Sequence, residues 1–109
     1  MSNTFTSDTT HMLNGVTANE FNYARFGHIA TVSGLINPSA VTTTGEVKIY
    51  TLPEAYRPSR STYFCIASNN SAITMTYGVV KTDGSVLIQL NDAVAKGSHK
   101  LFSVSYYIA

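Results

Sequence analysis

The sequence lacks tryptophan, has a single cysteine and carries few charged residues. Charged side chains make up 12% of its 109 residues, about half of the ~25% that is usual in soluble domains. Serine, threonine, asparagine and tyrosine supply the polarity, the formal net charge is +1, and no run of lysine or arginine occurs. Binding to nucleic acid or to an anionic membrane surface needs clustered cations, so both partners are excluded. An uncharged surface rich in hydrogen-bonding groups suits hydroxyl-rich partners or other protein chains.

The lone cysteine, Cys65, excludes an internal disulfide bond. It lies in the apolar run Tyr63–Ala67. We expect it to be a small buried hydrophobic residue, because a reactive thiol needs an electropositive and partly exposed setting. No apolar stretch approaches the ~20 residues of a membrane-spanning helix. The polar N-terminus does not resemble a signal peptide.

The beginning of the chain differs in composition from the rest. Residues 1–10 are serine, threonine, asparagine and aspartate apart from Met1 and Phe5. This composition is typical of a tether or an ordered arm rather than of a hydrophobic core. The chain is long enough for one domain and too short for two. We therefore expect an N-terminal arm or linker over residues 1–20 and a β-barrel domain over residues 21–109.

From His28 onward, apolar residues recur with a period of two, which is the period of half-buried strands. The runs cover residues 28–36, 46–50, 62–68, 72–79, 86–90 and 101–108. Thr82–Ser85 predicts a hairpin turn, because its Asp-Gly pair readily adopts positive φ. No helical period is long enough to predict a helix, and residues 92–96 favour a loop. The pattern predicts an all-β fold, a compact antiparallel β-barrel or sandwich of six to eight strands.

One face of each strand is expected to form the core. The expected core residues are Val32, Ile36, Val47, Ile49, Ile66, Val79, Val86 and Ile88. Tyr50 alternates with Val47 and Ile49, so it is expected to face solvent. The run Thr62–Ser68 is apolar on both faces, which predicts a strand that is central or covered on both sides.

The segment Leu52–Pro58 places a Tyr-Arg pair between two prolines. The prolines remove two backbone donors, so the segment can cross between sheets without offering an edge for pairing. Pro58 biases Arg57 toward extended geometry, which directs its side chain away from the local backbone. Tyr56 is expected to pack its ring and keep its hydroxyl in solvent. A rigid crossover that locks the barrel is favoured, with a ligand contact by Arg57 or a contact between subunits as alternatives.

These elements occur in a recognisable order. An opening strand Gly27–Gly34 precedes the Leu-Pro-x-x-Tyr-Arg-Pro segment and the Asp-Gly hairpin, and the closing strand ends in Tyr106-Tyr107-Ile108. The order resembles the C-terminal head domains of bacteriophage receptor-binding proteins and tail fibres, particularly of siphophages that infect lactic acid bacteria. The resemblance covers about Phe21 to Ala109.

The resemblance implies an adenovirus-knob-like barrel that forms a homotrimer at the tail tip or baseplate of the virion. Its partners would be a saccharide of the bacterial surface and other baseplate or fibre proteins. Heads of this kind often stack a sugar ring on tryptophan, so tyrosine or histidine would take that role here.

Motifs of common enzymes are missing from the sequence. It has no Gly-x-Ser-x-Gly, no His-Glu-x-x-His, no glycine-rich phosphate loop and no cysteine pair for zinc. We therefore expect neither catalysis nor a metal or cofactor. Amide, carboxylate, imidazole and phenol groups suit sugar hydroxyls. The candidate saccharide ligands are Asn69, Asn70, Tyr77, Asp92, His99 and Arg57. For the asparagines and Asp92, simple turns are the favoured interpretation and saccharide contacts the second, and His99 is expected in a loop.

Three function classes remain open. The first is a receptor-binding head that recognises a host surface saccharide without catalysis. The alternative is a structural decoration or baseplate protein that binds other viral proteins. A polysaccharide hydrolase needs two carboxylates flanking a cleft, and it is the least supported because few carboxylates are available. The terminal strand Phe102–Ile108 is rich in large apolar residues, which predicts a homotrimer with this strand near the threefold axis.

Overall fold

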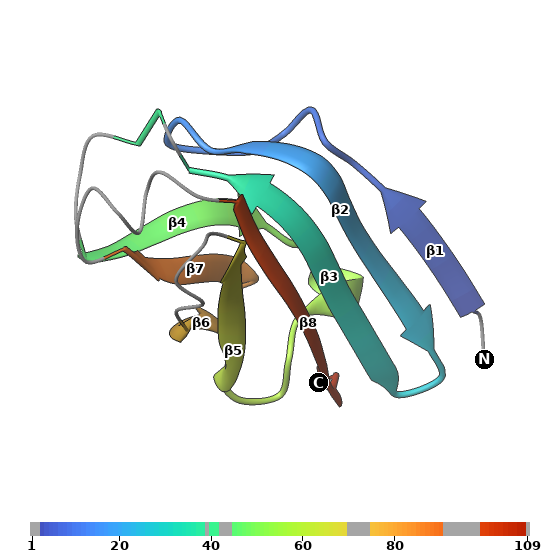
Figure 1. The fold of residues 1–109 in the computed structure, drawn as a ribbon. Coiled ribbons are helices and arrows are strands. Elements are labelled where there is room, and N and C mark those ends of the chain that lie inside the picture. The colour runs from blue at the N-terminus through green and yellow to red at the C-terminus, as the bar shows by residue number, and fades with distance from the viewer. Residues whose placement is uncertain (1–2, 39, 42–44, 70–74, 91–98, 109) are drawn as a thin grey trace.

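The computed structural model describes residues 3–38, 40–41, 45–69, 75–90 and 99–108 (Figure 1). The strands are β1 (Asn3–Ser7), β2 (Thr17–Phe26), β3 (Ile29–Asn37), β4 (Gly45–Thr51), β5 (Thr62–Asn69), β6 (Met75–Val80), β7 (Ser85–Leu90) and β8 (His99–Tyr107). A short 3-10 turn, η1 (Glu54–Tyr56), lies between β4 and β5. Within the described residues, no helix is long and apolar enough to cross a membrane. The all-β prediction is confirmed.

All of these strands belong to one antiparallel sheet, in the order β1-β2-β3-β8-β5-β6-β7-β4. The sheet curls on itself into a half-barrel (Figure 1). Because there is one sheet, the segment Leu52–Pro58 does not cross between sheets as predicted. It leaves the edge strand β4 and enters β5 in the interior of the same sheet.

Strands β5 and β8 form a fork. They pair only at one end, where Ala67 faces Leu101 and Asn69 faces His99, and β8 continues alongside β3. Phe64 of β5 and Phe102 of β8 stack across the divergence with ring centroids 5.0 Å apart. Residue 78 must be glycine for this packing, because a Cβ there would lie 2.4 Å from Cζ of Phe64.

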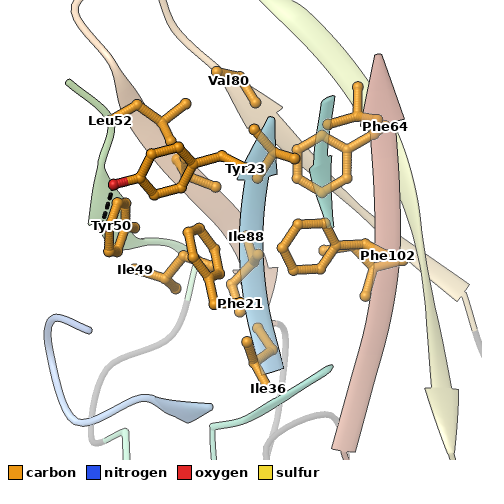
Figure 2. Close-up of a cluster of buried hydrophobic side chains, with 14 of the residues drawn as sticks. Phe21, Tyr23, Ile36, Ile49, Tyr50, Leu52, Phe64, Val80, Ile88 and Phe102 are labelled. Carbon is orange, nitrogen blue, oxygen red and sulfur yellow. Dashed lines mark hydrogen bonds between the residues drawn. The ribbon is translucent and has the colours of Figure 1, made fainter. Parts of the chain in front are cut away.

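The inner face of the sheet packs one core of aliphatic and aromatic side chains (Figure 2). Every expected core residue is buried: Val32, Ile36, Val47, Ile49, Ile66, Val79, Val86 and Ile88. Val79 is buried but does not lie on the inner face with the others. Its pairing partners are Tyr63 and Leu87, and its neighbour Val80 belongs to the core, so Val79 is buried on the outer face.

Tyr50 is buried, although its alternation with Val47 predicts exposure to solvent. The pairing register of β4 with β7 shifts between Lys48 and Tyr50. Such a bulge re-aims the side chains that follow it, so Ile49 and Tyr50 are both buried. The Tyr50 ring lies 4.4 Å from the ring of Phe21, centroid to centroid. A local irregularity thus adds a phenol to the core (Figure 2).

The crossover Leu52–Pro58 closes one end of the half-barrel. Leu52 N donates to the carbonyl oxygen of Gly84 in the β6–β7 turn at 2.8 Å. Tyr106 Oη of β8 donates to the Tyr56 carbonyl oxygen at 2.6 Å, and the Tyr56 ring packs edge-on against Tyr23 of β2 at 4.7 Å. These contacts join three distant parts of the sheet, which supports the interpretation as a locking crossover.

Two details of the crossover differ from the sequence prediction. Arg57 turns back on the local backbone, where its Nε donates to the Leu52 carbonyl oxygen at 3.2 Å. The Tyr56 hydroxyl, which was expected in solvent, is hydrogen-bonded to Thr4 of β1, and the residue is buried. Both side chains therefore form hydrogen bonds within the fold, Arg57 with the crossover itself and Tyr56 with β1.

Residues 3–20, the described part of the expected arm, contribute to the sheet. They include β1, the connection that follows it and the start of β2. Leu13 N donates to the Ile49 carbonyl oxygen at 2.9 Å, and Asn14 Nδ2 donates to the Lys48 carbonyl oxygen at 2.8 Å. These bonds protect the outer edge of β4, which would otherwise be open to pairing. The division into an arm or linker over residues 1–20 and a β-barrel domain over residues 21–109 stays a prediction.

Replacing Gly78 with alanine is expected to lower the free energy of unfolding by about 1–3 kcal/mol, the usual cost of overpacking. The new Cβ would lie 2.4 Å from the Phe64 ring and 2.7 Å from the backbone oxygen of Leu87. Urea denaturation measures the change. In the Gly78→Ala, Phe64→Leu double variant, the combined loss should be smaller than the sum of the single losses. Strict additivity would contradict a clash between these residues.

Candidate functional site

The outer face of the sheet carries exposed apolar side chains from most of its strands. These are Phe5, Phe26, Ile29, Tyr63, Tyr77, Leu101 and Tyr107. Among the described strand residues, the charged side chains of this face are Glu20, Glu46 and Lys48. The outer face therefore offers rings and hydroxyls rather than charge.

Two tyrosines form an exposed pair on this face. Tyr63 of β5 is 68% exposed and Tyr77 of β6 is 42% exposed. Their ring centroids are 6.1 Å apart with a tilt of 49°. The Tyr77 hydroxyl donates to Oε1 of Gln89 on β7 at 3.4 Å. Tyr77 was expected from the sequence as a ligand, and Tyr63 was not. The Tyr63 ring lies beside Tyr77 because β5 and β6 pair in a register that places Tyr63 opposite Val79, and the sequence does not give that register.

The pairing register extends this surface toward β4. Leu87 of β7 pairs with Val79 on one side and with Lys48 on the other, and Gln89 pairs with Glu46. The outer surface around the tyrosine pair thus continues across β7 to a polar region at β4. A groove of about 550 Å³ lies there, lined by Asn14, Gly15, Ala40, Glu46, Val47, Lys48 and Leu87.

A second depression of about 440 Å³ lies at the fork between β5 and β8. Its lining is Glu20, Ser33, Gly34, Cys65, Ala67, Leu101, Phe102 and Ser103. Cys65 is exposed there, so the prediction of a buried cysteine is wrong. Strand β5 is central in the sheet, but only one of its faces is covered. Phe64 and Ile66 point from the inner face into the core, whereas Cys65 lies on the outer face.

The structure brings some of the sequence candidates together and separates others. Asn69 and His99 are direct partners at the fork, and His99 begins β8 rather than lying in a loop. Asn70 and Asp92 lie outside the described residues. Arg57 precedes β5 and therefore lies at the opposite end of that strand from Asn69. Its guanidinium is held by the crossover, so Arg57 does not join the other candidates.

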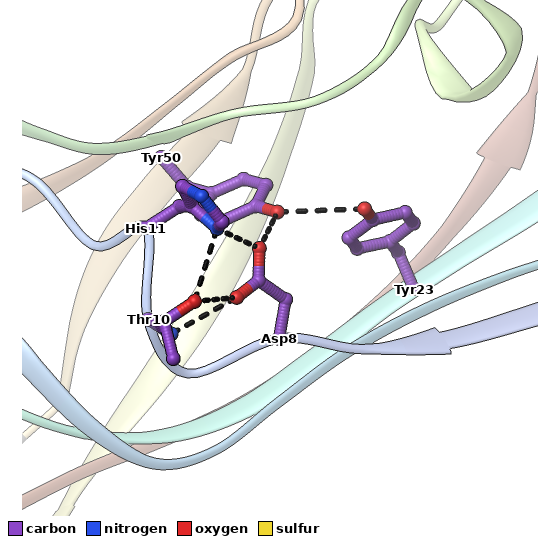
Figure 3. A network of polar contacts seen from close by, with 5 residues as sticks. All are labelled: Asp8, Thr10, His11, Tyr23 and Tyr50. Atoms are coloured by element: carbon purple, nitrogen blue, oxygen red, sulfur yellow. Dashed lines mark hydrogen bonds and ion pairs between the residues drawn. The ribbon is translucent and has the colours of Figure 1, made fainter.

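A network of hydrogen bonds that shifts the pKa values of two side chains lies elsewhere, around Asp8 and Tyr50 (Figure 3). Asp8 Oδ2 accepts from Tyr50 Oη at 2.7 Å and lies 2.8 Å from His11 Nδ1. Asp8 Oδ1 accepts from the backbone N and the hydroxyl of Thr10, both at 2.9 Å. These bonds, that of Tyr50 first, hold the pKa of Asp8 well below its usual range. Burial raises the pKa of Tyr50 above its ordinary value, so the phenol stays protonated as the donor.

Both carboxylate oxygens of Asp8 are engaged by donors, and the group joins the segment after β1 to β4. We call this group of hydrogen bonds around Asp8 the clasp, because it holds two segments together. It is not the geometry of an acid or base directed at a substrate. Within the described residues, no cluster of three or more histidine, cysteine or acidic side chains is arranged to hold a metal ion.

Comparison with known proteins identifies the fold. No family model and no curated protein matches the chain. Among solved structures, it matches the receptor binding protein (gp15) of Listeria phage PSA with a TM-score of 0.73 and 19% sequence identity. The match covers 99% of this chain and 67% of that chain. This chain shares its fold with a phage receptor-binding protein. The likeness does not single out phages of lactic acid bacteria, because that neighbour belongs to a Listeria phage.

Replacing Asp8 with asparagine is expected to lower the free energy of unfolding at pH 7 by about 1 kcal/mol, because charge-assisted hydrogen bonds are lost at a partly exposed site. The pKa of Asp8 is lowered in the folded chain. Its contribution is therefore full above about pH 5 and is lost progressively as the pH falls below about 4. Urea midpoints of the parent and Asp8→Asn should converge as the pH falls from 5 toward 2.

The control for this prediction is Glu54→Gln, which removes an exposed carboxylate of η1. Its difference from the parent should stay small at each pH. A deficit of Asp8→Asn that is the same at pH 7 and pH 2 would contradict the electrostatic account of the clasp.

Proposed function

We propose that the chain is the receptor-binding head of a phage tail protein, which binds a saccharide of the bacterial surface without catalysis. The observation that carries this proposal is the fold shared over 99% of the chain with the receptor binding protein of a Listeria phage. The proposed location is the tail tip or baseplate of the virion, outside the host cell. The proposed host is a Gram-positive bacterium in general.

The chemistry of the surface supports a saccharide as the receptor. Only 12% of the residues are charged, and the outer face exposes tyrosine rings next to amide and hydroxyl groups. Sugar rings present apolar C–H faces and hydroxyl edges, which match aromatic faces and neutral hydrogen-bonding groups. We place a first contact region at the strand ends around Asn69 and His99, with Asn70 and Asp92 in the connections next to them in sequence.

The proposed assembly is a homotrimer with β8 near the threefold axis. Phe102 and Val104, which suggested an interface from the sequence, pack into the core of their own chain. The proposed interface therefore rests on outer-face side chains of β2, β3 and β8, at the end where β2 turns into β3. Phe26 pairs with Ile29, which pairs with Tyr107, and 70% of the Tyr107 surface is exposed. Apolar patches of this kind are uncommon on monomers.

Binding of the purified head to whole bacteria tests the function. Cells of Gram-positive strains, Listeria and lactic acid bacteria included, should bind the labelled head, and periodate oxidation of their surface saccharides should abolish binding. A single shallow site should bind with a Kd on the order of 1 mM to 1 μM, and a trimer should bind more tightly through avidity.

Folded protein that binds no strain, but captures a tail or baseplate protein, would contradict this function and favour a structural role in the virion. Release of reducing sugar from host cell walls would contradict the absence of catalysis.

Replacing Tyr107 with lysine is expected to dissociate the trimer at micromolar concentration, because it would place charge in the proposed apolar interface. The fold should persist, since this side chain is exposed in the single chain. Light scattering after size-exclusion chromatography measures the mass. The matched control is Thr51→Lys, at an exposed position of the edge strand β4. A parent protein that is a stable monomer would rule out the assembly.

A further inference from the structure

The surface that runs from Tyr63 and Tyr77 to the groove at β4 has the composition of a sugar-binding strip. Resting on the proposed function, the geometry points to a specific subsite for a neutral oligosaccharide across β5, β6, β7 and β4. One sugar ring of the oligosaccharide stacks on the tyrosine pair, and Glu46, Lys48 and Gln89 bind its hydroxyl groups. This subsite is separate from the strand ends around Asn69 and His99.

The aromatic end of the strip is already oriented. The Tyr77 ring lies against Tyr63 with centroids 6.1 Å apart, and its hydroxyl is tied to Gln89 at 3.4 Å. A tyrosine held in this way loses little conformational freedom when a ligand covers it. Substantial exposure of both rings leaves their faces accessible to the C–H face of a sugar.

The polar end of the strip offers both kinds of hydrogen-bonding group. Glu46 is an acceptor of two or more bonds and Lys48 a donor of three, and both line the groove. Asn14 Nδ2 is bonded to the Lys48 carbonyl oxygen at 2.8 Å, which fixes the rim of the groove. Paired donors and acceptors in a concave site are what the vicinal hydroxyls of a sugar require.

The charges around the groove select a neutral ligand. Glu46 and Lys48 carry opposite charges. In the adjacent turn, the hydrogen bond from the Ser85 backbone is the main cause that lowers the pKa of Asp83, and the charges of Lys48 and Lys81 lower it further. Positive and negative groups are therefore balanced, so an anionic ligand such as a phosphate gains no net attraction. A neutral hexose or N-acetylhexosamine needs no net attraction between charges, because its hydroxyl groups can bond to both the acceptor Glu46 and the donor Lys48.

The spacing of the strip sets a minimum ligand length. Tyr77 on β6 and Glu46 on β4 are separated by two strand intervals, or about 10 Å. A ligand that contacts both must be at least a disaccharide. The strip lies on β5–β6–β7–β4, whereas Phe26, Ile29 and Tyr107 of the proposed trimer interface lie on β2, β3 and β8. The assembled trimer would leave the strip exposed.

The test compares variants of the intact chain in binding to host cells and to an array of neutral and phosphorylated oligosaccharides. Tyr77→Ala and Glu46→Gln should each weaken binding about tenfold or more, as for a central contact. Tyr77→Phe keeps the ring and should retain most of the binding. Thr51→Ala, at an exposed position of β4 outside the groove, should bind as the parent does. Circular dichroism and urea midpoints identify any variant that is misfolded.

Chemical-shift changes provide a second measurement that does not depend on the variants. Millimolar N,N′-diacetylchitobiose and lactose serve as neutral probes, and inorganic phosphate serves as the anionic one. At least one neutral probe should shift the amide signals of Tyr77, Leu87 and Lys48, while phosphate should leave them unchanged. Shifts with phosphate alone would overturn the assignment of a neutral ligand.

The outcomes separate this inference from the proposed function. If Tyr77→Ala and Glu46→Gln bind cells as the parent does, and the Asn69→Ala, Asn70→Ala double variant loses binding, the strip is overturned and the receptor-binding role stands. If the folded parent binds neither cells nor saccharides, both fail. Loss of binding in Tyr77→Ala and Glu46→Gln supports the strip, provided that Thr51→Ala binds fully and Tyr77→Phe keeps most of the binding.

Discussion

The buried Tyr56 is the residue on which the half-barrel depends. A single curled sheet leaves two edge strands and an open end, and it cannot cover its own core there. Tyr56 is inserted at that end, where its ring packs on Tyr23, its carbonyl accepts from Tyr106 and its hydroxyl meets Thr4. Burial raises the pKa of Tyr106. A buried phenol left without an acceptor would cost about 1–3 kcal/mol, so this closure couples β8 to the crossover.

Closure of the core determines where binding groups can lie. Strands β2 to β8 all contribute inner side chains to the core, so the outer face and the strand ends are what remain for partners. The strand order then divides the outer face. Strands β1, β2, β3 and β8 carry Phe5, Phe26, Ile29 and Tyr107, whereas β5, β6, β7 and β4 carry the tyrosine pair and the polar groove. One thin sheet thereby offers an apolar surface and a hydrogen-bonding surface without a second domain.

Sequence patterns predicted much of the fold and less of the candidate site. Alternation found the buried faces of β3, β7 and β8, and the Asp-Gly turn occurs where expected, with Gly84 at φ 89. The failures have particular causes. Tyr50 is buried because a bulge shifts the register after Lys48, Cys65 is exposed because nothing in the described chain covers the outer face of β5, and Arg57 is held by a carbonyl that the closed crossover brings to it.

The sequence by itself determined the all-β class, the inward and outward alternation of most strands, the hairpin turn and the low surface charge. These properties depend on neighbours within a few residues, through the period of a strand and the φ preferences of glycine and proline. Only the tertiary structure decided the strand order and the register. They bring Tyr63 beside Tyr77 and Glu46 beside Gln89, and they separate Arg57 from Asn69. Register is not local, because it is set by hydrogen bonds between distant strands and by how the shared core closes.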